Sequence, residues 1–598
     1  MTVDAVEVPE LDESQRAVAE AGAADRLLVT AGAGQGKTEV VAARIRYLVE
    51  EEDLSASTEI LVLSFSRAAV HAVRTRLDAR DIARTSVRTF DSFASYLLSQ
   101  NEIEPVGSFE NRVRQATRLL ADRAREIEGI DEIAHLVLDE VQDLVGDRAE
   151  MVLALVARLD ESAGFTALGD PLQGIYDFTL DESHSKLSST EFADRMASEF
   201  GATRVGLQRN YRARGEFPRE VVRLGDHIRE GDRQTAATTL EDFEITLPHS
   251  GKIKDWHFLE GGEGRTAILC ATNGEVLRVS RFLTDQAVDH VVRRPAQDFG
   301  AARWIAEILA DLAGPEVART DVESVIERRL EGFLRDEAWY LLKGAEGRSR
   351  SMNQLNLARL RSLVSRGAVP LTLTDRDTAD VIVSTIHRAK GLEFERAYFV
   401  HPNSPVGDQT DWPALRQKYV AFSRARDEVK VLDIPTEWAW FETRDGRQRE
   451  RKTGRSKRKY TAAIEFGSRD TSDAAPVSGD AVRAMAMQRR LLTATPGEVI
   501  NAFFDPTLTK SDGEPIFVLC DSGGNELGVT TRWFGRSLAY DFAYRFRDGW
   551  DGVILQGLRL VSVDTVACDP RLTEESGLGR SGFWLVPRVF GLVSPDQG

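Results

Sequence analysis

Residues 26–38, RLLVTAGAGQGKT, place a short apolar run directly before a glycine-rich loop that ends in a lysine and a threonine. The residues that follow, roughly Lys37 to Glu50, have the apolar periodicity of an amphipathic helix. Strand, loop and helix in this order match the phosphate-binding pattern GxxxxGK[ST], except that Ala31 occupies the first glycine position. The stretch therefore predicts an α/β fold that binds a nucleotide.

The loop has the residues that phosphate binding needs. Gly32, Gly34 and Gly36 allow backbone N–H groups to crowd around a phosphate, and the helix that follows adds the positive end of its dipole. Lys37 is placed to reach the β and γ phosphates, and the Thr38 hydroxyl is a candidate Mg²⁺ ligand. The predicted nucleotide contacts also include Ala33, Gln35 and Glu39.

A second string, DEVQD at residues 139–143, comes about a hundred residues later and directly after the apolar run HLVL. Two adjacent acids in a loop are usually only solvated, but at the end of a buried-type strand they predict catalysis. Asp139 is the candidate Mg²⁺ ligand, Glu140 the carboxylate that activates water, and Gln142 a sensor of the bound state. Together the two strings predict hydrolysis of a nucleoside triphosphate with Mg²⁺.

Further apolar runs of strand length alternate with helix-like segments, which is typical of parallel sheets with crossover helices. These runs lie at 60–64, 135–139, 165–170, 266–271, 381–385, 397–400 and 429–433. The segment at about 290–375, between the runs at 266–271 and 381–385, is helix-like and charged. From about residue 485 onward, apolar and polar residues alternate on either side of a Gly-Gly turn. This pattern predicts a small β-rich domain.

The composition excludes several classes of protein. Hydrophobic residues make up 42% of the 598, no apolar run is long enough to cross a bilayer, and the acidic start lacks the features of a signal peptide. Cys270, Cys520 and Cys568 are scattered without zinc-site spacing, so we expect a cytoplasmic protein without disulfides or zinc. A net charge of −18 argues against coating nucleic acid through bulk charge and restricts any such contact to a local basic surface.

One strongly basic segment, RDGRQRERKTGRSKRK at 444–459, holds nine basic and two acidic residues. Its composition favours a solvated, partly disordered tether, and we expect a basic linker over 441–484. The alternative is an arm that binds phosphates and offsets the acidic charge locally.

At the level of motifs the chain resembles the UvrD/Rep/PcrA group of superfamily 1 helicases, with a compact form somewhat like the helicase subunit of Gabija-type defence. The resemblance extends from about residue 11 to residue 432. Its motifs, beyond the two strings above, are LDESQRAV (11–18), SFSRAAVHAVRTRL (64–77), RTFDSFASYLL (88–98), GDPLQGIYDF (169–178), QRNYR (208–212), STIHRAKGLEF (384–394) and YVAFSRARDEV (419–429).

The resemblance implies roles for particular residues around ATP. Gln15 would read the adenine, Tyr211 would stack on it and Glu393 would contact the ribose. Gln173 would sense the γ-phosphate, and Arg212 and Arg424 would act as arginine fingers from the second domain. Candidate contacts to single-stranded DNA are Phe65, Arg67, Phe90, Phe178 and His387, with Phe93 and Arg88 as further candidates; packing in the core is the alternative for Phe65 and Phe93.

The resemblance also implies two RecA-like P-loop domains with parallel sheets and a short helical insertion in the second, to which the residue pattern after about 485 adds the β-rich C-terminal domain. The expected boundaries are 1–204 for domain 1A with a minimal 1B insertion at about 99–134; 205–290 with 376–440 for domain 2A; 291–375 for a reduced 2B-like insertion; 441–484 for the linker; and 485–598 for the β-rich domain.

The chain departs from the family in ways that bear on function. Glu39 and Thr179 stand where relatives often have an arginine, and Phe178 where they often have tryptophan. Both insertions are short, and because the larger domains of relatives engage duplex, translocation is a firmer prediction than strong unwinding.

Three functions follow as hypotheses. The first is an ATP-dependent 3′–5′ translocase or helicase on single-stranded DNA, with DNA repair and antiviral defence as candidate pathways. The second is an ATP-gated regulatory subunit, with little unwinding of its own, for a partner such as a nuclease of an anti-phage system or RNA polymerase. A fused helicase–nuclease is disfavoured, because no convincing PD…(D/E)xK pattern follows residue 440.

Overall fold

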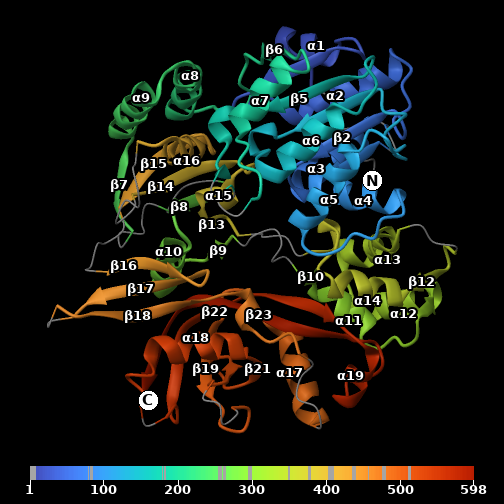
Figure 1. Ribbon diagram of the computed structural model, residues 1–598. Coiled ribbons are helices and arrows are strands. Elements are labelled where there is room, and N and C mark those ends of the chain that lie inside the picture. The colour runs from blue at the N-terminus through green and yellow to red at the C-terminus, as the bar shows by residue number, and fades with distance from the viewer. Residues whose placement is uncertain are drawn as a thin grey trace. The chain divides into compact units, whose positions relative to one another are not determined.

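The computed structural model describes two compact units (Figure 1). Unit 1 comprises residues 1–249, 389–399 and 405–431, and unit 2 comprises 250–388, 400–404 and 432–598. The described residues are 9–78, 80, 82, 85–177, 180, 183–253, 259, 264–293, 300–347, 351–374, 379–401, 410–433, 439–454, 457–474, 480–509, 514–547 and 549–597. Among them, no helix combines the length and the apolar character needed to cross a membrane.

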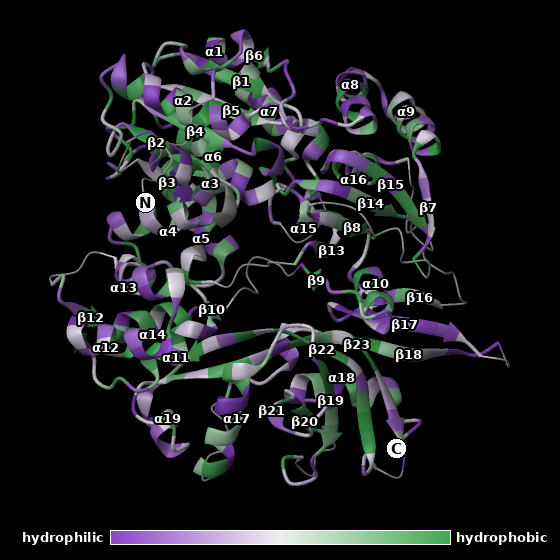
Figure 2. Cartoon of the chain, turned by 180° about the vertical axis from the view of Figure 1, so that it is seen from behind, coloured by the Kyte–Doolittle hydropathy of each residue, from purple (hydrophilic) through white to green (hydrophobic). Residues whose placement is uncertain are grey.

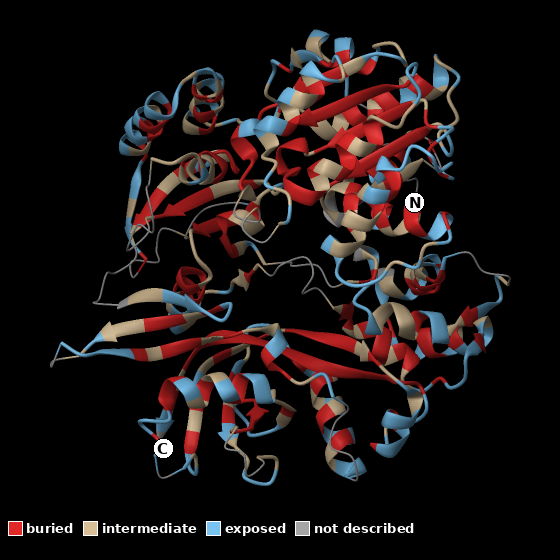
Figure 3. Cartoon of the chain, in the orientation of Figure 1, coloured by how far each residue is buried: buried red, intermediate tan, exposed pale blue. Residues whose placement is uncertain are grey.

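Unit 1 is built on a six-stranded parallel sheet with the order β3-β2-β4-β5-β1-β6. Its central strands are short apolar runs that are buried throughout (Figure 3), as expected for a sheet covered on both faces. The strands are β1 (Arg26–Thr30), β2 (Ile60–Ser64), β3 (Ser86–Thr89), β4 (His135–Asp139), β5 (Gly164–Gly169) and β6 (Thr203–Gly206).

Alternate residues of each strand enter two different hydrophobic clusters, one on each face of the sheet. In β4, Leu136 and Leu138 pack with α4 to α7, whereas Val137 packs in the cluster that holds α2 and α3. This alternation follows from the two-residue repeat of a strand. The helices are α1 (Glu13–Ala19), α2 (Lys37–Glu50), α3 (Arg67–Asp78), α4 (Phe90–Gln100), α5 (Phe109–Ala121), α6 (Gly146–Val156) and α7 (Ser189–Ser198).

Unit 1 also contains two helices that follow the sheet in sequence and two later segments of the chain, 389–399 and 405–431. Helices α8 (Glu216–Glu230) and α9 (Arg233–Thr246) pack against each other and against α16 (Trp412–Phe422). Strands β14 (Phe394–Val400) and β15 (Ala425–Asp433) are neighbours in a second sheet, and β7 (His249–Lys252) and α15 (Ile386–Ala389) lie where the chain passes between the units.

Unit 2 also contains parallel strands. Strand β13 (Val381–Thr385) pairs in parallel with β8 (Thr266–Cys270) and with β9 (Val291–Val292), and α10 (Asn273–Asp285) packs on them. The predicted fold class, two parallel-sheet α/β domains with a β-rich C-terminal part, is confirmed.

The larger part of unit 2 is a nine-stranded sheet with the order β16-β17-β18-β23-β22-β19-β20-β21, in which β10 also pairs with β22. Every pairing in it is antiparallel. The strands are β10 (Ala301–Ala302), β16 (Ala439–Arg444), β17 (Arg447–Thr453), β18 (Lys459–Phe466), β19 (Val499–Phe504), β20 (Phe517–Cys520), β21 (Glu526–Val529), β22 (Val553–Ala567) and β23 (Phe583–Gln597), with helices α17 (Ala481–Thr493), α18 (Arg532–Phe542) and α19 (Pro570–Glu575).

The expected helical insertion is present, and it shares one hydrophobic core with this sheet. Trp304 and Leu342 of the insertion belong to the same buried cluster as Leu555 and Val589 of the long strands β22 and β23. The insertion contains α11 (Arg303–Leu309), α12 (Arg319–Arg329), α13 (Gly332–Glu346) and α14 (Leu357–Ser365), with a two-stranded ribbon of β11 (Glu316–Ala318) and β12 (Gln354–Asn356).

The expectation of a basic linker over 441–484 is wrong. These residues form β17, β18 and most of β16, and Figure 2 shows β17 as strongly hydrophilic. Arg447 and Arg449 point into the protein, where each pairs with a buried carboxylate: Arg447 with Asp470 at 2.6 Å, and Arg449 with Asp541 at 2.7 Å. Their charges are neutralised by residues far along the chain, which composition alone does not reveal.

Candidate nucleotide-binding site

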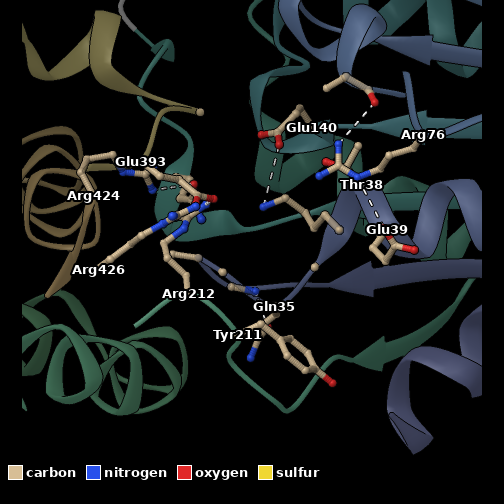
Figure 4. Close-up of a pocket in the computed structure, with 18 of the residues that line it drawn as sticks. Gln35, Thr38, Glu39, Arg76, Glu140, Tyr211, Arg212, Glu393, Arg424 and Arg426 are labelled. Atoms are coloured by element: carbon tan, nitrogen blue, oxygen red, sulfur yellow. Dashed lines mark hydrogen bonds and ion pairs between the residues drawn. The ribbon is translucent and has the colours of Figure 1, made fainter. Parts of the chain in front are cut away.

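A cavity of about 480 Å³ lies in unit 1 beside the glycine-rich loop. In Figure 4, Arg212, Arg424 and Arg426 gather around Glu393 on one side, and Thr38, Glu39 and Arg76 lie on the other. The described lining residues are 32–39, Ala72, Arg76, Glu140, Gln173, Tyr211, Arg212, Arg214, Gly391, Glu393, Arg424 and Arg426. The cavity thus brings together most of the residues predicted for ATP binding.

The loop conformation requires glycine at two positions. Gly34 has φ +75° and Gly36 has φ +79°, in the left-handed region that other residues avoid. A Cβ atom at Gly34 would lie 2.4 Å from the Cβ of Arg212, and one at Gly36 would lie 2.6 Å from the Gln15 amide nitrogen. The glycines therefore allow the loop to turn into α2 and let neighbouring side chains approach closely.

Lys37 begins α2 and bridges the two predicted motifs. Its Nζ donates to the Ala31 carbonyl at 3.2 Å and lies 3.9 Å from Oε1 of Glu140. Burial acts against a charged Glu140, but Lys37 and Lys390 hold the pKa of this carboxyl below its ordinary value. Glu140 is thus a carboxylate able to accept a proton, at the position predicted for the base that activates water.

Asp139 ends β4 and carries an oxygen without a protein partner. Its Oδ2 accepts from Ser64 Oγ at 3.2 Å, whereas its buried Oδ1 accepts no hydrogen bond from any residue that the structure describes. Burial, aided by the charge of Glu140, raises the pKa of Asp139 to about 7. A divalent cation would satisfy the bare oxygen and restore the charged form, so Asp139 and the hydroxyl of Thr38 fit the hard oxygen ligands that Mg²⁺ prefers.

Behind the cavity, side chains link the two glutamines of these motifs. Gln142 donates to Glu140 and accepts from the backbone N–H of Asp170 at 3.1 Å. Gln173 donates to Asp170 at 2.8 Å, and Asp170 accepts from Arg229 of α8 at 3.0 Å. Gln142 and Gln173, which the sequence predicts as sensors, are therefore joined through the buried Asp170.

Arg212 pairs with Glu393 at 2.6 Å, and Arg426 pairs with the other oxygen of Glu393, also at 2.6 Å. Burial alone would raise the pKa of Glu393, but the two arginines lower it overall. The predicted finger and the predicted ribose contact therefore hold each other in this structure, and both line the cavity.

Arg424 is 1% exposed and is held by acceptors on several sides. Its Nη2 donates to Gln173 Oε1 at 3.1 Å, and its Nε donates to the Val420 carbonyl at 3.0 Å. Burial, with the nearby charge of Arg212, lowers the pKa of Arg424 to about 9. The second predicted finger is thus in direct contact with the predicted phosphate sensor.

The residues predicted to surround the adenine lie at the edge of the loop. Gln15 donates to the Gln35 carbonyl at 3.0 Å, and Tyr211, 46% exposed, donates to Asp12 at 2.7 Å. Glu39 pairs with Arg80 and, at 3.5 Å, with Arg76. Arg76 lines the cavity and so supplies a guanidinium near the position where relatives often have an arginine in the loop.

The predicted DNA contacts have mixed positions. Phe65 is half-buried, with its ring centroid 5.0 Å from that of Tyr176. Phe90 and Phe93 are 1% and 0% exposed in the hydrophobic core, so neither side chain is available to stack on a base, which corrects the expectation for Phe90. Arg88 is half-buried over the ring of Tyr96 at 3.8 Å.

The other three predicted DNA contacts are only partly described. His387 is half-buried on α15. Phe178 lies outside the described residues, as does the side chain of Arg67, although the backbone of Arg67 begins α3.

Several residues in and around the site were not singled out from the sequence, among them Arg76 and Arg426, described above, and Lys390 and Arg229. Lys390 pairs with Asp143 at 2.6 Å and also donates to the Gln173 carbonyl, so it links the DEVQD string to the string that contains Glu393. Its place within STIHRAKGLEF was the available signal. Arg229, the partner of Asp170, lies in an ordinary amphipathic helix and gives no such signal.

Comparisons with known proteins agree with the motifs. The UvrD/REP helicase N-terminal domain matches residues 11–121, and the UvrD-like helicase C-terminal domain matches residues 380–432. A search of curated proteins finds no match.

Among solved structures, the Pif1 helicase from Candida albicans is 15% identical with a TM-score of 0.35, covering 71% of this chain and 95% of that one. The Pif1 helicase from Bacteroides in complex with ADP-AlF3 and ssDNA is 14% identical with a TM-score of 0.34, covering 71% and 92%. At these scores the likeness in shape is distant and carries no argument. The likeness to known proteins therefore rests on residues 11–121 and 380–432, which match the N-terminal and C-terminal domains of UvrD-like helicases.

Proposed function

We propose that this chain is an ATP-dependent translocase and helicase that moves 3′ to 5′ along single-stranded DNA. The observation that carries the proposal is one cavity lined by the phosphate-binding loop, by Glu140 and by the arginines Arg212 and Arg424. Loop, carboxylate and arginines are the parts that phosphoryl transfer to water requires.

Each part has a distinct task in hydrolysis. The loop N–H groups and Lys37 bind the phosphates, and Glu140, charged and close to Lys37, takes a proton from the attacking water. Thr38 and Asp139 would hold Mg²⁺, which when bound neutralises negative charge on the phosphate oxygens. The bare Oδ1 of Asp139 supports this assignment.

The arginines provide the link between chemistry and motion. Arg212 and Arg424 stabilise charge on the transferring phosphate only when they turn towards it, and in this structure both are held by other partners, Glu393 and Gln173. ATP therefore competes for these guanidinium groups. Such competition lets nucleotide binding favour one conformation and product release the other.

ATP hydrolysis with and without single-stranded DNA tests the proposal. The chain should hydrolyse ATP slowly alone and much faster with an oligonucleotide, and Lys37→Ala or Glu140→Gln should abolish both rates. The matched control is Glu20→Gln, because its side chain is exposed and lies outside the cavity. Hydrolysis that no nucleic acid stimulates would contradict the motor and favour a core gated by a protein partner, such as a nuclease or RNA polymerase.

Unwinding of tailed duplexes tests the direction. A duplex with a 3′ tail should be unwound and one with a 5′ tail should not, since movement along the tail must run towards the duplex. The opposite preference would refute the 3′–5′ direction. Movement along single strands without unwinding of either duplex would restrict the proposal to translocation.

A further inference from the structure

The ribbon formed by β16, β17 and β18 carries positive charge that the protein leaves uncompensated. Lys457, Arg458 and Lys459 are exposed at the end of the ribbon, next to the half-buried Lys452. None of these four forms an ion pair with a described residue. Figure 1 shows β17 and β18 running out beyond the other strands of their sheet. On a chain with a net charge of −18, such a cluster is a local exception.

The two faces of this ribbon differ. Phe441 and Glu450 point towards α10, where Arg278 lies over the Phe441 ring at 4.5 Å and pairs with Glu450 at 2.8 Å. Because successive side chains of a strand alternate between faces, Trp440 and Arg444 lie on the opposite face, which packs against α18. Arg449 reaches Asp541 of α18 from that same face.

The α18 face, defined here as Trp440, Arg444, Lys459, Trp533 and Tyr540, places aromatic rings and cations side by side. Lys459 lies 5.2 Å from the centroid of Trp440, and Arg444 lies 4.2 Å from that of Tyr540. Tyr540 is 62% exposed and Trp533 is 46% exposed. From Trp440 to Arg444 the strand alone spans about 13 Å.

The charge on the α18 face stays positive after its own ion pairs are counted. Each nearby carboxylate already has an arginine: Glu442 of β16 pairs with Arg451 at 3.3 Å, Asp445 in the turn after β16 with Arg444 at 3.7 Å, and Asp541 of α18 with Arg449 at 2.7 Å. Within the described part of the chain, these carboxylates form no ion pair with the cations at the end of the ribbon.

We propose that the α18 face and the basic end of the ribbon bind single-stranded DNA, as a contact outside the nucleotide-binding unit. Uncompensated cations recognise the phosphate backbone, and exposed rings beside them offer surfaces on which bases stack. Single-stranded DNA, rather than duplex, is the ligand that uses both features, because the bases of a duplex already stack on one another. The choice of DNA as the ligand rests on the proposed function. The description of the surface as basic and aromatic is independent of that function.

The test is equilibrium binding of a fluorescent oligonucleotide without nucleotide, measured over a range of salt concentrations. Lys457→Glu, Arg458→Glu and Lys459→Glu together should weaken binding at least ten-fold at low salt. They should also reduce the slope of log affinity against log salt by about 2, since each lost phosphate contact on a single strand accounts for about 0.7. The matched control changes Arg328, Arg335 and Arg366, three exposed arginines of the helical insertion, to Glu, which gives the same change in net charge.

A second variant separates stacking from charge. Tyr540→Leu should weaken binding about five-fold or more while leaving the salt slope unchanged, because a stacking surface is lost but no phosphate contact is. Should the triple reversal lower the melting temperature, the same three positions changed to Gln should still reduce the slope by about 2.

Unchanged affinity and slope in both variants would overturn the inference. Variants that lose binding to duplex DNA but keep binding to the single-stranded oligonucleotide would also overturn it. So would variants that lose binding to polyglutamate but keep binding to the oligonucleotide. The outcome is separable from that of the proposed function. A chain whose ATP hydrolysis is not stimulated by DNA would contradict the motor, whereas the ribbon is judged by binding without ATP.

Discussion

The guanidinium of Arg212 donates to the carboxylate of Glu393 at 2.6 Å within the cavity beside the phosphate-binding loop. A residue proposed to act on the phosphate and one proposed to bind the ribose thus neutralise each other in this structure. Since the proposed roles require both side chains to contact ATP instead of each other, this pair is a direct test of those roles.

Arg212→Ala should reduce kcat for ATP by about 1,000-fold or more, because an arginine that stabilises the transition state acts on the chemical step. Glu393→Ala should instead raise KM, with a smaller effect on kcat, since the ribose contact is made equally in ground and transition states. Steady-state hydrolysis with saturating single-stranded DNA measures both. If the two variants changed KM to the same extent and kcat to the same extent, the separate roles of Arg212 at the phosphate and Glu393 at the ribose would be contradicted.

Asp139→Asn should lower kcat about 100-fold and shift the Mg²⁺ dependence of hydrolysis to higher concentration, because the buried Oδ1 loses its charge. Ser64→Ala is the matched control: it removes the hydrogen bond to Oδ2 but leaves Oδ1 in place. ADP binding at increasing Mg²⁺ gives a readout independent of turnover. A Mg²⁺ dependence identical to that of the unmodified chain would remove Asp139 from the metal site.

Lys390→Ala should destabilise the protein by about 3 kcal/mol, because it leaves the buried carboxylate of Asp143 unpaired. The double variant Lys390→Met with Asp143→Asn should recover much of that loss, since neither group is then charged. Chemical unfolding followed by fluorescence measures the difference. A double variant as unstable as Lys390→Ala would show that the pair contributes through shape instead of charge.

The contribution of His135 to stability should fall as pH drops below about 6.5. Burial, with Arg44 nearby, lowers the pKa of His135 to about 3 from an ordinary value near 6.5. Between these values the unfolded chain binds a proton that the folded chain does not, so acid favours unfolding by about 1.4 kcal/mol per pH unit from this group.

His135→Gln keeps a donor for the Ala23 carbonyl and an acceptor for Thr166, the two partners of His135, but does not titrate. From pH 7 to pH 4 the melting temperature of this variant should rise relative to that of the unmodified chain. Parallel curves for the variant and the unmodified chain would rule out His135 as a source of the acid sensitivity.

The nucleotide site could be predicted from sequence largely because its signals are local. The glycines, Lys37 and Thr38 occupy consecutive positions, and the residues around Asp139 follow a strand that is apolar throughout. The link from Arg424 to Gln173 was not predictable, because it joins residues 251 positions apart through a single hydrogen bond.

The structure of residues 441–466 could not be predicted from sequence for a related reason. A run of arginines and lysines has the composition of a solvated tether, yet two of the arginines are buried because Asp470 and Asp541 meet them there. Neither aspartate lies within the basic run. The expectation that Phe90 contacts DNA is wrong for a different reason. Its motif resembles one that contacts DNA strands, but its side chain is buried in the core.

The single hydrophobic core that joins the helices of 303–365 to strands β22 and β23 sets a limit on how this chain could have been assembled during evolution. Loss of the C-terminal strands alone would expose the apolar side chains of those helices, and loss of the helices alone would expose the strands. The two segments, separated in sequence by the motifs from 384 to 429, must therefore be gained, lost or exchanged together. Relatives that have one without the other should show different residues at Trp304 and Leu342.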